Sequence, residues 1–519
     1  MKNSLAVLCL FMLFAVNSEA GFRPKTYVCF RTDDEIVIDG KLDEGAWLRA
    51  PESDLFVDIE GDRMPLPWFG TRVKLLWDDE YLYCAAYLED TNVWGTLFER
   101  DARVYHDNDF EIFLDIDNDG RWYYEFEMNP LNTVYDLVRA SKQARLEIEW
   151  DIEGIKTAVH VVGTLNNPAD VDRGWYCEIA WPMKSLKEFA GSMAVPPLEG
   201  DEWRIDFPRV EYIFDEESKV LQRKPGTRAQ NWAWSPPLVI NNHWIEALGF
   251  LRFSTQLAGT QDDSAIAVGL EKPFLTLDPK KRKHVKAGSM ALIPGGEFTL
   301  GPDPLDPVTS PAHSVTLDDF YIDKYEVTVA EYTAFLNGVK KDEHYFKHMA
   351  HYDCGIVKNG DGSYSVTPGR EEYPIVYVNL ADAEAYAAWA GKRLPTEAEW
   401  ECAARFDDGR PYAWGDDALS PVRCNFNYHY GSTQKIGSFP EGKTTQGVFD
   451  MTGNVWEICA GEFGLYPGGK NVYDFKPTTV YRGGSWATPP KMLHTSVREV
   501  RIQRTPFVGF RCVKDVKNN

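Results

Sequence analysis

Three aspartates at alternating positions, Asp115, Asp117 and Asp119, precede Gly120 and could supply oxygen ligands to a calcium ion. The pattern matches the start of an EF-hand loop, which has carboxylates at positions 1, 3 and 5 and a glycine at position 6. That loop also needs a glutamate at position 12, where this sequence has Phe126. We therefore interpret the segment as a hairpin turn, and a calcium site of another kind at these carboxylates stays open.

A second set of hard oxygen atoms surrounds Gly453. Asp450 and Glu457 carry carboxylates, and the backbone carbonyls between them complete the mixture of ligands that calcium prefers. In the alternative interpretation, both carboxylates only hydrogen-bond the backbone of a loop. Both interpretations are retained.

Other catalytic chemistry has weaker support in the sequence. His344 and His348 have the spacing of one helix face, with His351 nearby, and histidines that converge with a carboxylate can bind iron. Solvated histidines in an inserted loop explain the same pattern more simply. The sequence contains no GxSxG, HExxH, GxGxxG or P-loop motif, and its carboxylates are too numerous to single out a glycosidase pair.

Aromatic side chains offer a different chemistry, because the face of an aromatic ring can stack on the C–H groups of a sugar. The chain has 17 Trp, 25 Tyr and 28 Phe residues. We predict carbohydrate platforms at Trp68, Trp94 and Trp234, which lie in loop-like contexts. Trp77 and Trp181 have the alternating spacing of core positions in strands. Further candidates are Trp122, Trp232 and Trp244.

The elements that must position these residues differ between the two halves of the chain. In the first half, short β-rich runs at 73–77, 82–88, 110–116, 122–128 and 175–181 are separated by turn signals, which predicts an all-β sandwich. In the second half, residues 327–337 and 381–389 have helical apolar spacing. Thr396 and Glu399 form a capping-box pattern that opens a helix over 396–405. Long glycine-rich and aromatic-rich loops separate these helices, so we predict an α+β domain.

The 519 residues divide into four predicted segments. Residues 1–20 read as a signal peptide, with Lys2, an apolar run over 5–16 and the cleavage pattern Ser18-Glu19-Ala20. The sandwich covers 21–255, a linker rich in polar and basic residues covers 256–287, and the second domain covers 288–519. We expect the mature chain to be secreted, periplasmic or on the cell surface. No later segment reaches 18 apolar residues, so we expect no membrane span.

The net charge of −24 disfavours a nucleic-acid partner, since such a surface repels phosphate backbones. Eight cysteines remain after the signal segment is removed, and none forms a CxxC pair. Disulfides are compatible with an oxidising compartment, but their connectivity stays open.

The first half resembles carbohydrate-binding module family 9. The resemblance rests on the ordered phrases IDGKLDEGAW, VKLLWDDEYLYCAAYLED, DNDFEIFLDIDNDGRWYYEFEMNP, GWYCEIAWP, WSPP and LGFLRF. It covers roughly residues 22–254. It implies a β-sandwich that binds sugars, with structural calcium in some members.

The second half resembles the formylglycine-generating enzyme, or sulfatase-modifying factor, family. The motifs in order are MALIPGGEFTLG, FYIDKYEVTVAEYTAFL, YPIVYVNLADAEAYAAWAGKRLPTEAEWECAAR, YAWG, GVFDMTGNVWEI, YRGGSW and GFRC, from about Gly288 to Lys514. The resemblance implies a loop-rich fold related to C-type lectins. It also implies two copper-binding cysteines between RGGSW and GFRC, expected near Thr488 and Leu493. Residues 485–498 contain no cysteine, so we expect neither copper nor formylglycine generation.

The same resemblance implies further site residues. Carried over by position, calcium would be held by the side chains of Asp450 and Glu457 and the carbonyls of Gly453 and Val455. A second family calcium site begins near Asn425, but its later aspartate is replaced here. Cys402 and Cys512 lie near positions that the family joins by a disulfide.

Together these features predict a secreted carbohydrate-binding protein that recognises a polysaccharide or glycoconjugate. Its C-terminal domain would be catalytically inactive and could bind a secreted enzyme. The alternatives are an enzyme, either a metal-dependent oxidase with a rearranged site or a polysaccharide hydrolase, and a structural surface protein.

Overall fold

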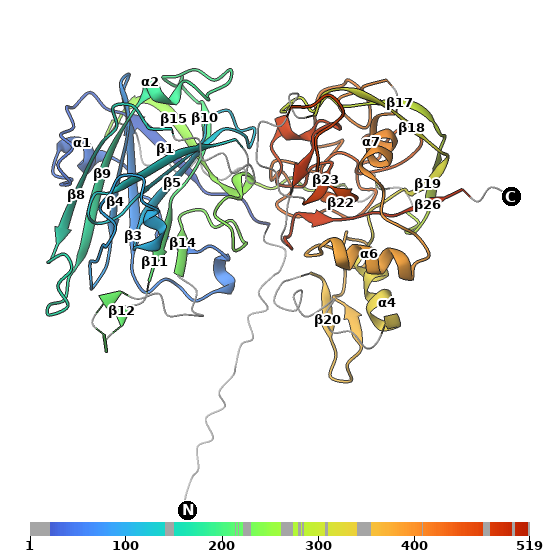
Figure 1. Cartoon of the computed structure of the whole chain (residues 1–519), viewed down its shortest axis with the longest axis horizontal. Helices are drawn as coiled ribbons and strands as arrows, with labels where there is room; N and C mark the ends of the chain where they lie inside the picture. The colour runs from blue at the N-terminus through green and yellow to red at the C-terminus, as the bar shows by residue number, and fades with distance from the viewer. Residues whose placement is uncertain are drawn as a thin grey trace, which may run out of the picture.

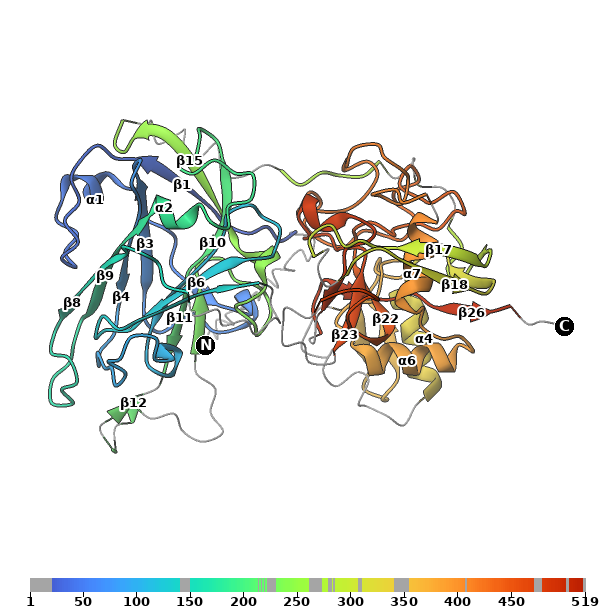
Figure 2. The same ribbon diagram turned by 45° about the horizontal axis from the view of Figure 1, so that its top comes forward.

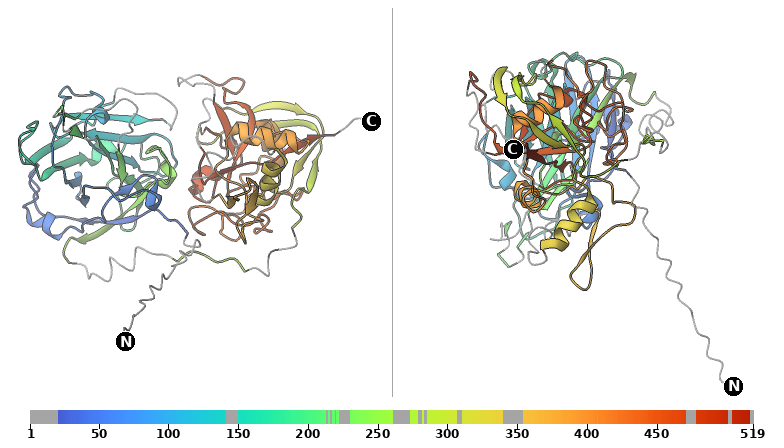
Figure 3. Two further views of the ribbon diagram at one scale, coloured as in Figure 1. Left: turned by 90° about the horizontal axis from the view of Figure 1, so that it is seen from below. Right: turned by 90° about the vertical axis from the view of Figure 1, so that its right-hand side faces the viewer.

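The computed structural model shows two domains that lie side by side, and they remain so when viewed from below (Figures 1 and 3). It describes residues 21–140, 150–212, 214–215, 217–218, 220–221, 230–260, 273–278, 282, 285–306, 310–339, 354–406, 408–470, 478–500 and 504–516. The predicted signal peptide, part of the predicted linker and the three clustered histidines at 344, 348 and 351 lie outside these residues. None of the helices in the described ranges has an apolar run long enough to span a bilayer.

The first domain is built on one ten-stranded sheet that curls until its two halves face each other (Figure 2). Its strand order is β7-β6-β5-β10-β15-β1-β3-β4-β9-β8. The strands are β1 (Thr26–Arg31), β3 (Thr71–Trp77), β4 (Tyr81–Leu88), β5 (Phe110–Asp115), β6 (Tyr123–Met128), β7 (Val134–Arg139), β8 (Lys156–Val162), β9 (Gly174–Pro182), β10 (Glu202–Asp206) and β15 (Gly249–Leu257).

The core of this domain lies between the two halves of the curled sheet, as a sandwich requires. Trp181 on β9 meets Phe126 and Tyr124 on β6, with ring centroids 6.0 and 5.6 Å apart. The predicted strand runs all coincide with observed strands, because their alternating apolar residues line this core. The prediction of an all-β sandwich is therefore confirmed.

The domain also contains a second, three-stranded sheet. Its order is β11-β14-β2, formed by β11 (Pro208–Glu211), β14 (Gln230–Ala233) and β2 (Val57–Asp58). Smaller elements are α1 (Gly45–Arg49), α2 (Met183–Leu186), the hairpin β12 (Phe214–Asp215) and β13 (Val220–Leu221), and the 3-10 turns η1 (Gly61–Arg63), η2 (Val104–His106) and η3 (Ile245–Ala247).

The turn between β5 and β6 is a hairpin, as the sequence predicts. The Asp115 carboxylate accepts hydrogen bonds from the backbone N–H groups of Asn118 at 3.0 Å and Gly120 at 2.9 Å. Gly120 has a φ of +72°, a conformation that favours glycine. Oxygen atoms of Asp115, Asp117 and Asp119 also lie within 4.8 Å of one another, so the calcium alternative stays open.

The second domain combines short sheets with three helices among the described residues. Its helices are α4 (Val329–Val339), α6 (Leu380–Trp389), α7 (Glu397–Arg405) and the 3-10 turn η4 (Pro490–Leu493). Its sheets are β16-β19-β26, β17-β18, β20-β21 and β24-β23-β22-β25. The strands are β16 (Met290–Ile293), β17 (Gly296–Leu300), β18 (His313–Leu317), β19 (Phe320–Asp323), β20 (Ile356–Lys358), β21 (Tyr364–Val366), β22 (Trp456–Glu462), β23 (Thr479–Arg482), β24 (Glu499–Val500), β25 (Val508–Gly509) and β26 (Val513–Asp515).

All three predicted helices form, and α7 begins with the predicted capping box. Thr396 Oγ1 accepts from the Glu399 backbone N–H at 3.2 Å, and the Glu399 carboxylate accepts from the Thr396 N–H at 2.8 Å. The α+β prediction for this half is confirmed, because loops connect these few helices to short strands.

Candidate functional site

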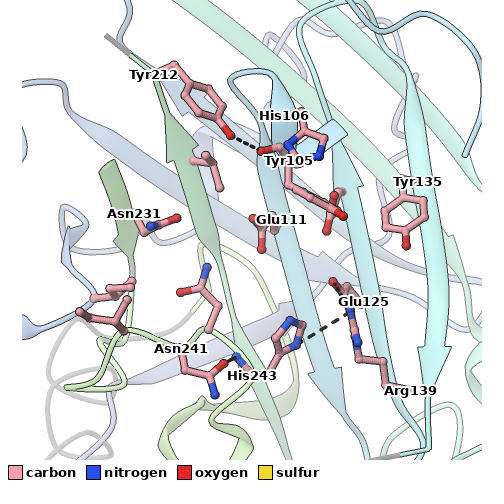
Figure 4. Close-up of a pocket in the computed structure, with 15 residues that line it drawn as sticks. Tyr105, His106, Glu111, Glu125, Tyr135, Arg139, Tyr212, Asn231, Asn241 and His243 are labelled. Atoms are coloured by element: carbon pink, nitrogen blue, oxygen red, sulfur yellow. Dashed lines mark hydrogen bonds and ion pairs between the residues drawn. The ribbon is translucent and has the colours of Figure 1, made fainter. Parts of the chain in front are cut away.

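A pocket of about 480 Å³ lies on the face of β5, β6 and β7 that points away from the sandwich core (Figure 4). Strands β11 and β14 and the segment 240–243 line its other side. Its lining residues are Ile59, Tyr105, His106, Glu111, Glu125, Glu127, Tyr135, Arg139, Val210, Tyr212, Asn231, Ile240, Asn241, Asn242 and His243.

The alternation of the two strands places three glutamates in this pocket. Apolar residues such as Ile112 on β5 and Phe126 on β6 face the core, so their neighbours Glu111, Glu125 and Glu127 face the pocket. Glu111 and Glu127 are directly opposite each other in the antiparallel pair. All three are almost fully buried, with at most 4% of each residue exposed.

Glu125 is the charged centre of the pocket. Its carboxylate forms an ion pair with Arg139 on β7, a diagonal neighbour across the strands, and lies 3.9 Å from Nδ1 of His243. The Tyr123 hydroxyl lies 3.1 Å from the same His243 nitrogen. Burial disfavours the carboxylate, but His243 and Arg139 outweigh it and lower the pKa of Glu125.

The pKa values of Glu111 and Glu127 shift in the opposite direction to that of Glu125. Burial, together with the carboxylates of Asp109 and Glu125, raises the pKa of both groups well above the usual range. Oε2 of Glu127 is buried and has no hydrogen-bond partner. A protonated carboxyl can donate one hydrogen bond and accept another, so these groups suit a ligand that carries hydroxyls.

Aromatic rings and amides complete the pocket. The Tyr212 hydroxyl donates to the Tyr105 carbonyl at 2.6 Å, and the Tyr105 ring lies near Tyr135 and His106, with centroids 6.4 and 4.5 Å away. Figure 4 shows Asn231 and Asn241 on the wall opposite His106 and Tyr135. The arrangement can hold an uncharged ligand between flat side chains while carboxyls and amides hydrogen-bond its hydroxyls.

The three predicted tryptophans lie elsewhere. Trp234 is only 2% exposed and packs against Phe207 and Tyr27 in the sandwich core, so it has no exposed face for a sugar, and that assignment is corrected. Trp68 is 52% exposed, with its ring edge-on to Trp232. Trp94 is half-buried. Trp68 and Trp94 therefore stay predictions, although neither lines the pocket.

The three further tryptophan candidates pack against other parts of the protein. Trp232 is buried in the sandwich core, Trp244 is buried between the domains, and Trp122 stacks on Phe189 at 5.6 Å. The sequence patterns did not lead us to predict four of the residues that line this pocket, Glu111, Glu125, Glu127 and His243. The signal for the glutamates was present, since they alternate with the apolar residues of FEIFLD and YYEFEM.

In the second domain, both positions at which copper-binding cysteines were expected are completely buried. Leu493 packs against Cys424 and Phe426. Thr488 donates a hydrogen bond to the carboxylate of Glu246, which belongs to η3 of the first domain, at 3.2 Å.

The segment around Glu246 inserts into the second domain. Trp244 stacks on Phe507 with centroids 5.1 Å apart and belongs to the core of the second domain. The Glu246 carboxylate also accepts from Trp456 Nε1 at 3.1 Å, and its carbonyl accepts from the Tyr428 hydroxyl at 2.7 Å. The first domain therefore fills the space beside Thr488.

Each half of the chain matches a known protein family. Residues 276–516 match the sulfatase-modifying factor enzyme 1-like domain, and residues 38–192 match the carbohydrate family 9 binding domain-like family. The formylglycine-generating enzyme of Streptomyces coelicolor is 32% identical over 306 residues, which cover 48% of this chain and 97% of that enzyme. The chain belongs to the formylglycine-generating enzyme family. Its first half is a carbohydrate-binding module family 9-like domain.

Two further similarities extend the comparison. Hercynine oxygenase of Mycolicibacterium smegmatis is 35% identical over 267 residues, which cover 44% of this chain and 62% of that protein. A family 9 carbohydrate-binding module of Caldicellulosiruptor kristjanssonii, solved with cellotriose, has 16% identity and a TM-score of 0.30, and the match covers 46% of this chain and 98% of that one.

The calcium ligands carried over from the formylglycine-generating enzyme family fit only in part. Glu457 is fully buried and pairs with Arg511 through both oxygens at 2.6 Å, and it also accepts from Trp400 at 2.8 Å. Its carboxylate is therefore already neutralised. Asp450 lies instead beside Glu326, and burial followed by neighbouring charges raises the pKa of both carboxyls, that of Asp450 to about 6.

The surroundings of Asp450 do contain oxygen atoms that lack donors. Oε2 of Glu326 and Oδ1 of Asn425 are buried without a hydrogen-bond partner. Asn454 links these two residues, since it accepts from the Asn425 amide at 3.2 Å and donates to Glu326 Oε1 at 2.8 Å. These oxygens suit a cation better than Glu457 does.

The disulfide implied by the formylglycine-generating enzyme family is not formed. Cys402 is a buried thiol in the core that contains Trp400, whereas Cys512 is a buried thiol in the separate core that contains Trp456. Burial raises the pKa of the Cys512 thiol well above its usual range, which disfavours the reactive thiolate. The predicted pairing is therefore wrong for this structure.

Proposed function

We propose that this protein recognises a neutral carbohydrate through the pocket on β5, β6 and β7. The observation that carries the proposal is that three buried glutamates, three asparagines and several tyrosine rings line one pocket of about 480 Å³. This volume lies within the range of roughly 300–1,000 Å³ that is usual for ligand sites. The family 9 binding domain-like match independently supports a saccharide as the ligand.

The charge pattern of the pocket favours hydroxyl groups over ions. One carboxylate, Glu125, is paired with Arg139 and lies near His243, and burial favours the neutral form of Glu111 and Glu127. Sugar hydroxyls both donate and accept, as do neutral carboxyls and amides. The unpartnered Oε2 of Glu127 would then find its hydrogen bond in the ligand.

We further propose that the second domain performs no formylglycine generation. Neither Thr488 nor Leu493 supplies a thiol, and Glu246 occupies the space beside Thr488. The domain would then serve as a scaffold that binds a partner, such as an enzyme acting on the same polysaccharide or glycoconjugate. With the predicted signal peptide, this activity would take place outside the cytoplasm.

The test measures binding of the full chain to a panel of neutral oligosaccharides by calorimetry. We expect saturable binding that Glu127→Gln and His243→Ala each weaken at least tenfold. Glu202→Gln is the matched control, because Glu202 pairs with Arg252 away from the pocket. The variants Trp68→Ala and Trp94→Ala test the alternative platforms. If only these tryptophan variants lost binding, the ligand would lie outside the pocket and the proposal would fail.

Glycoside hydrolysis is a second candidate, because environments that separate the pKa values of neighbouring carboxyls are typical of an acid and base pair. The pKa of Glu125 is lowered and that of Glu127 raised, as such a pair requires. The two glutamates lie two residues apart on β6, and both line the pocket. Release of reducing sugar from the bound oligosaccharide would favour hydrolysis over binding alone.

We also propose calcium as a structural cofactor of the second domain. Glu326 and Asp450 would supply its carboxylates and Asn425 its amide oxygen, because two of these three side chains hold buried oxygens without donors. The Gly453 and Val455 carbonyls expected from the family remain predicted ligands. Bound calcium would compensate the two adjacent buried carboxyls, which otherwise favour their protonated forms.

A further inference from the structure

A second pocket, of about 460 Å³, lies where the two domains meet. Arg63 and Leu238 from the first domain line one side, and the segment 274–277 lines another. Arg370, Tyr373 and Tyr377 from the second domain complete it, with Gln434 and Trp486 among their neighbours. The pocket exists only because both domains contribute to it.

The charge of this pocket is opposite to that of the rest of the chain. The whole protein has a net charge of −24, yet the residues that line this pocket include two arginines and no aspartate or glutamate. The pocket on β5–β7, by contrast, contains three glutamates. An acid-free, doubly basic pocket in so acidic a protein attracts anions selectively.

Arg370 is the strongest indication of a ligand. Among the described residues it forms no ion pair, and its Nε is buried without a hydrogen-bond partner. Its guanidinium lies 4.2 Å from the centroid of the Tyr373 ring, and Lys435 Nζ lies 5.8 Å from the same centroid. The adjacent acidic residues are engaged elsewhere: Glu372 pairs with Arg282 at 2.7 Å, and Glu371 accepts from the Gly369 N–H at 3.2 Å.

Arg63 approaches from the other domain. Its Nη2 donates to the Tyr377 hydroxyl at 2.9 Å, and its guanidinium lies 5.8 Å from the centroid of that ring. This contact holds the Arg63 guanidinium at the pocket. Two tyrosine rings are thus each accompanied by an arginine, one supplied by each domain.

We propose that this pocket binds the anionic group of an acidic sugar, either a sulfate ester or a carboxylate. Guanidinium groups bind planar and tetrahedral oxyanions through paired N–H donors, and tyrosine rings pack against the sugar that carries the charge. The choice of a saccharide rests on the proposed function, whereas the anion site itself does not. The site differs from the pocket on β5–β7 in its residues and in the charge of its ligand.

To test this, the full chain is titrated with N-acetylglucosamine 6-sulfate, glucuronate, N-acetylglucosamine and inorganic sulfate. Binding is measured by calorimetry and by ligand-observed NMR. We expect the two acidic sugars to bind and to lose affinity as salt is raised. Arg370→Gln and Arg63→Gln should each weaken this binding at least tenfold, with a smaller loss for Arg370→Lys, which keeps the charge. Arg72→Gln, at a surface arginine paired with Glu52, is the matched control.

Several outcomes would overturn this proposal. The proposal would be wrong if neither acidic sugar bound, or if Arg370→Gln bound them as tightly as the parent protein does. It would also be wrong if inorganic sulfate alone bound as tightly as the sulfated sugar. The last result would show an anion site without sugar recognition. The Glu127→Gln variant separates the two proposals, since we expect it to lose neutral oligosaccharides and to keep the acidic sugars.

Discussion

The carboxylate of Glu246 accepts a hydrogen bond from the hydroxyl of Thr488, 242 residues away, at 3.2 Å. Glu246 is only 1% exposed and belongs to the first domain, whereas Thr488 lies within the second. Thr488 is one of the two positions near which the family resemblance led us to expect a copper-binding cysteine. The contact joins the two domains at this position.

Removing the Glu246 side chain should loosen this junction. In Glu246→Ala, the Trp456 indole N–H and the Thr488 hydroxyl both lose a buried acceptor, and we expect the free energy of unfolding to fall by about 2 kcal/mol. Glu246→Gln keeps an acceptor oxygen and should lose less. Urea unfolding followed by tryptophan fluorescence measures the effect, with Glu202→Ala as a control. An unchanged midpoint in Glu246→Ala would contradict the proposed role of this contact.

Two of the tryptophans chosen from sequence should respond differently to substitution. Trp234→Ala removes a buried ring from the sandwich core and should lower the free energy of unfolding by about 3–5 kcal/mol. Trp68 is half exposed, so Trp68→Ala should cost about 1 kcal/mol or less. Thermal unfolding of the two variants beside the parent protein checks both values. Equal losses would mean that the burial difference between these two rings is wrong.

The cysteines should behave as protected thiols. Eight are buried in this structure, and none of these eight is joined in a disulfide. We expect a thiol reagent such as DTNB to label none of them in the native protein and all eight in denaturant. The intact mass should not change on reduction. A native mass lower by one pair of hydrogens, restored by reductant, would instead support the Cys402–Cys512 bond.

Asp206 should make stability depend on pH. Burial raises its pKa to about 7, although the N–H groups of Ser235 and Phe207 and the charge of Lys25 oppose the shift. The folded state thus retains a proton that the unfolded chain, with a value near 3.8, has released. The stabilisation is present below the unfolded pKa and is lost as pH rises through about 7.

Between pH 5 and pH 8 the Asp206 contribution should fall by roughly 2–3 kcal/mol. Asp206→Asn has the shape of the protonated form and does not titrate, so its unfolding free energy should decline less over this range. Urea unfolding at the two pH values measures the difference between variant and parent. Identical pH dependence in both would show that Asp206 titrates normally in the folded protein.

Calcium should stabilise the second domain through Glu326 and Asp450. We expect millimolar calcium to raise the melting temperature and a chelator to reverse the change, because the ion would compensate two adjacent buried carboxyls. Glu326→Gln and Asp450→Asn should each abolish the calcium effect. Asp417→Asn, at an exposed aspartate paired with Arg423, should leave it unchanged. No calcium effect in the parent protein would rule this cofactor out.

Local patterns in the sequence were sufficient for the elements and the family. The alternation in FEIFLD and YYEFEM predicts β5 and β6, and the capping box at Thr396 predicts α7, because such preferences depend on neighbouring residues. The ordered motifs place both halves in their families for the same reason. Even the pocket glutamates follow from strand alternation, once one face of the strand is known to form the core.

Long-range partners were decided only by the tertiary structure. Trp68 and Trp234 occur in similar local contexts, yet one is exposed and the other buried, because exposure depends on what the rest of the chain packs against. Likewise, Glu457 forms an ion pair with Arg511, so this carboxylate, which the family motif implies as a calcium ligand, is already neutralised. The insertion of Glu246 beside Thr488 and the basic pocket between the domains require two folded surfaces to meet. Contacts between the two domains therefore cannot be predicted from local patterns of residues.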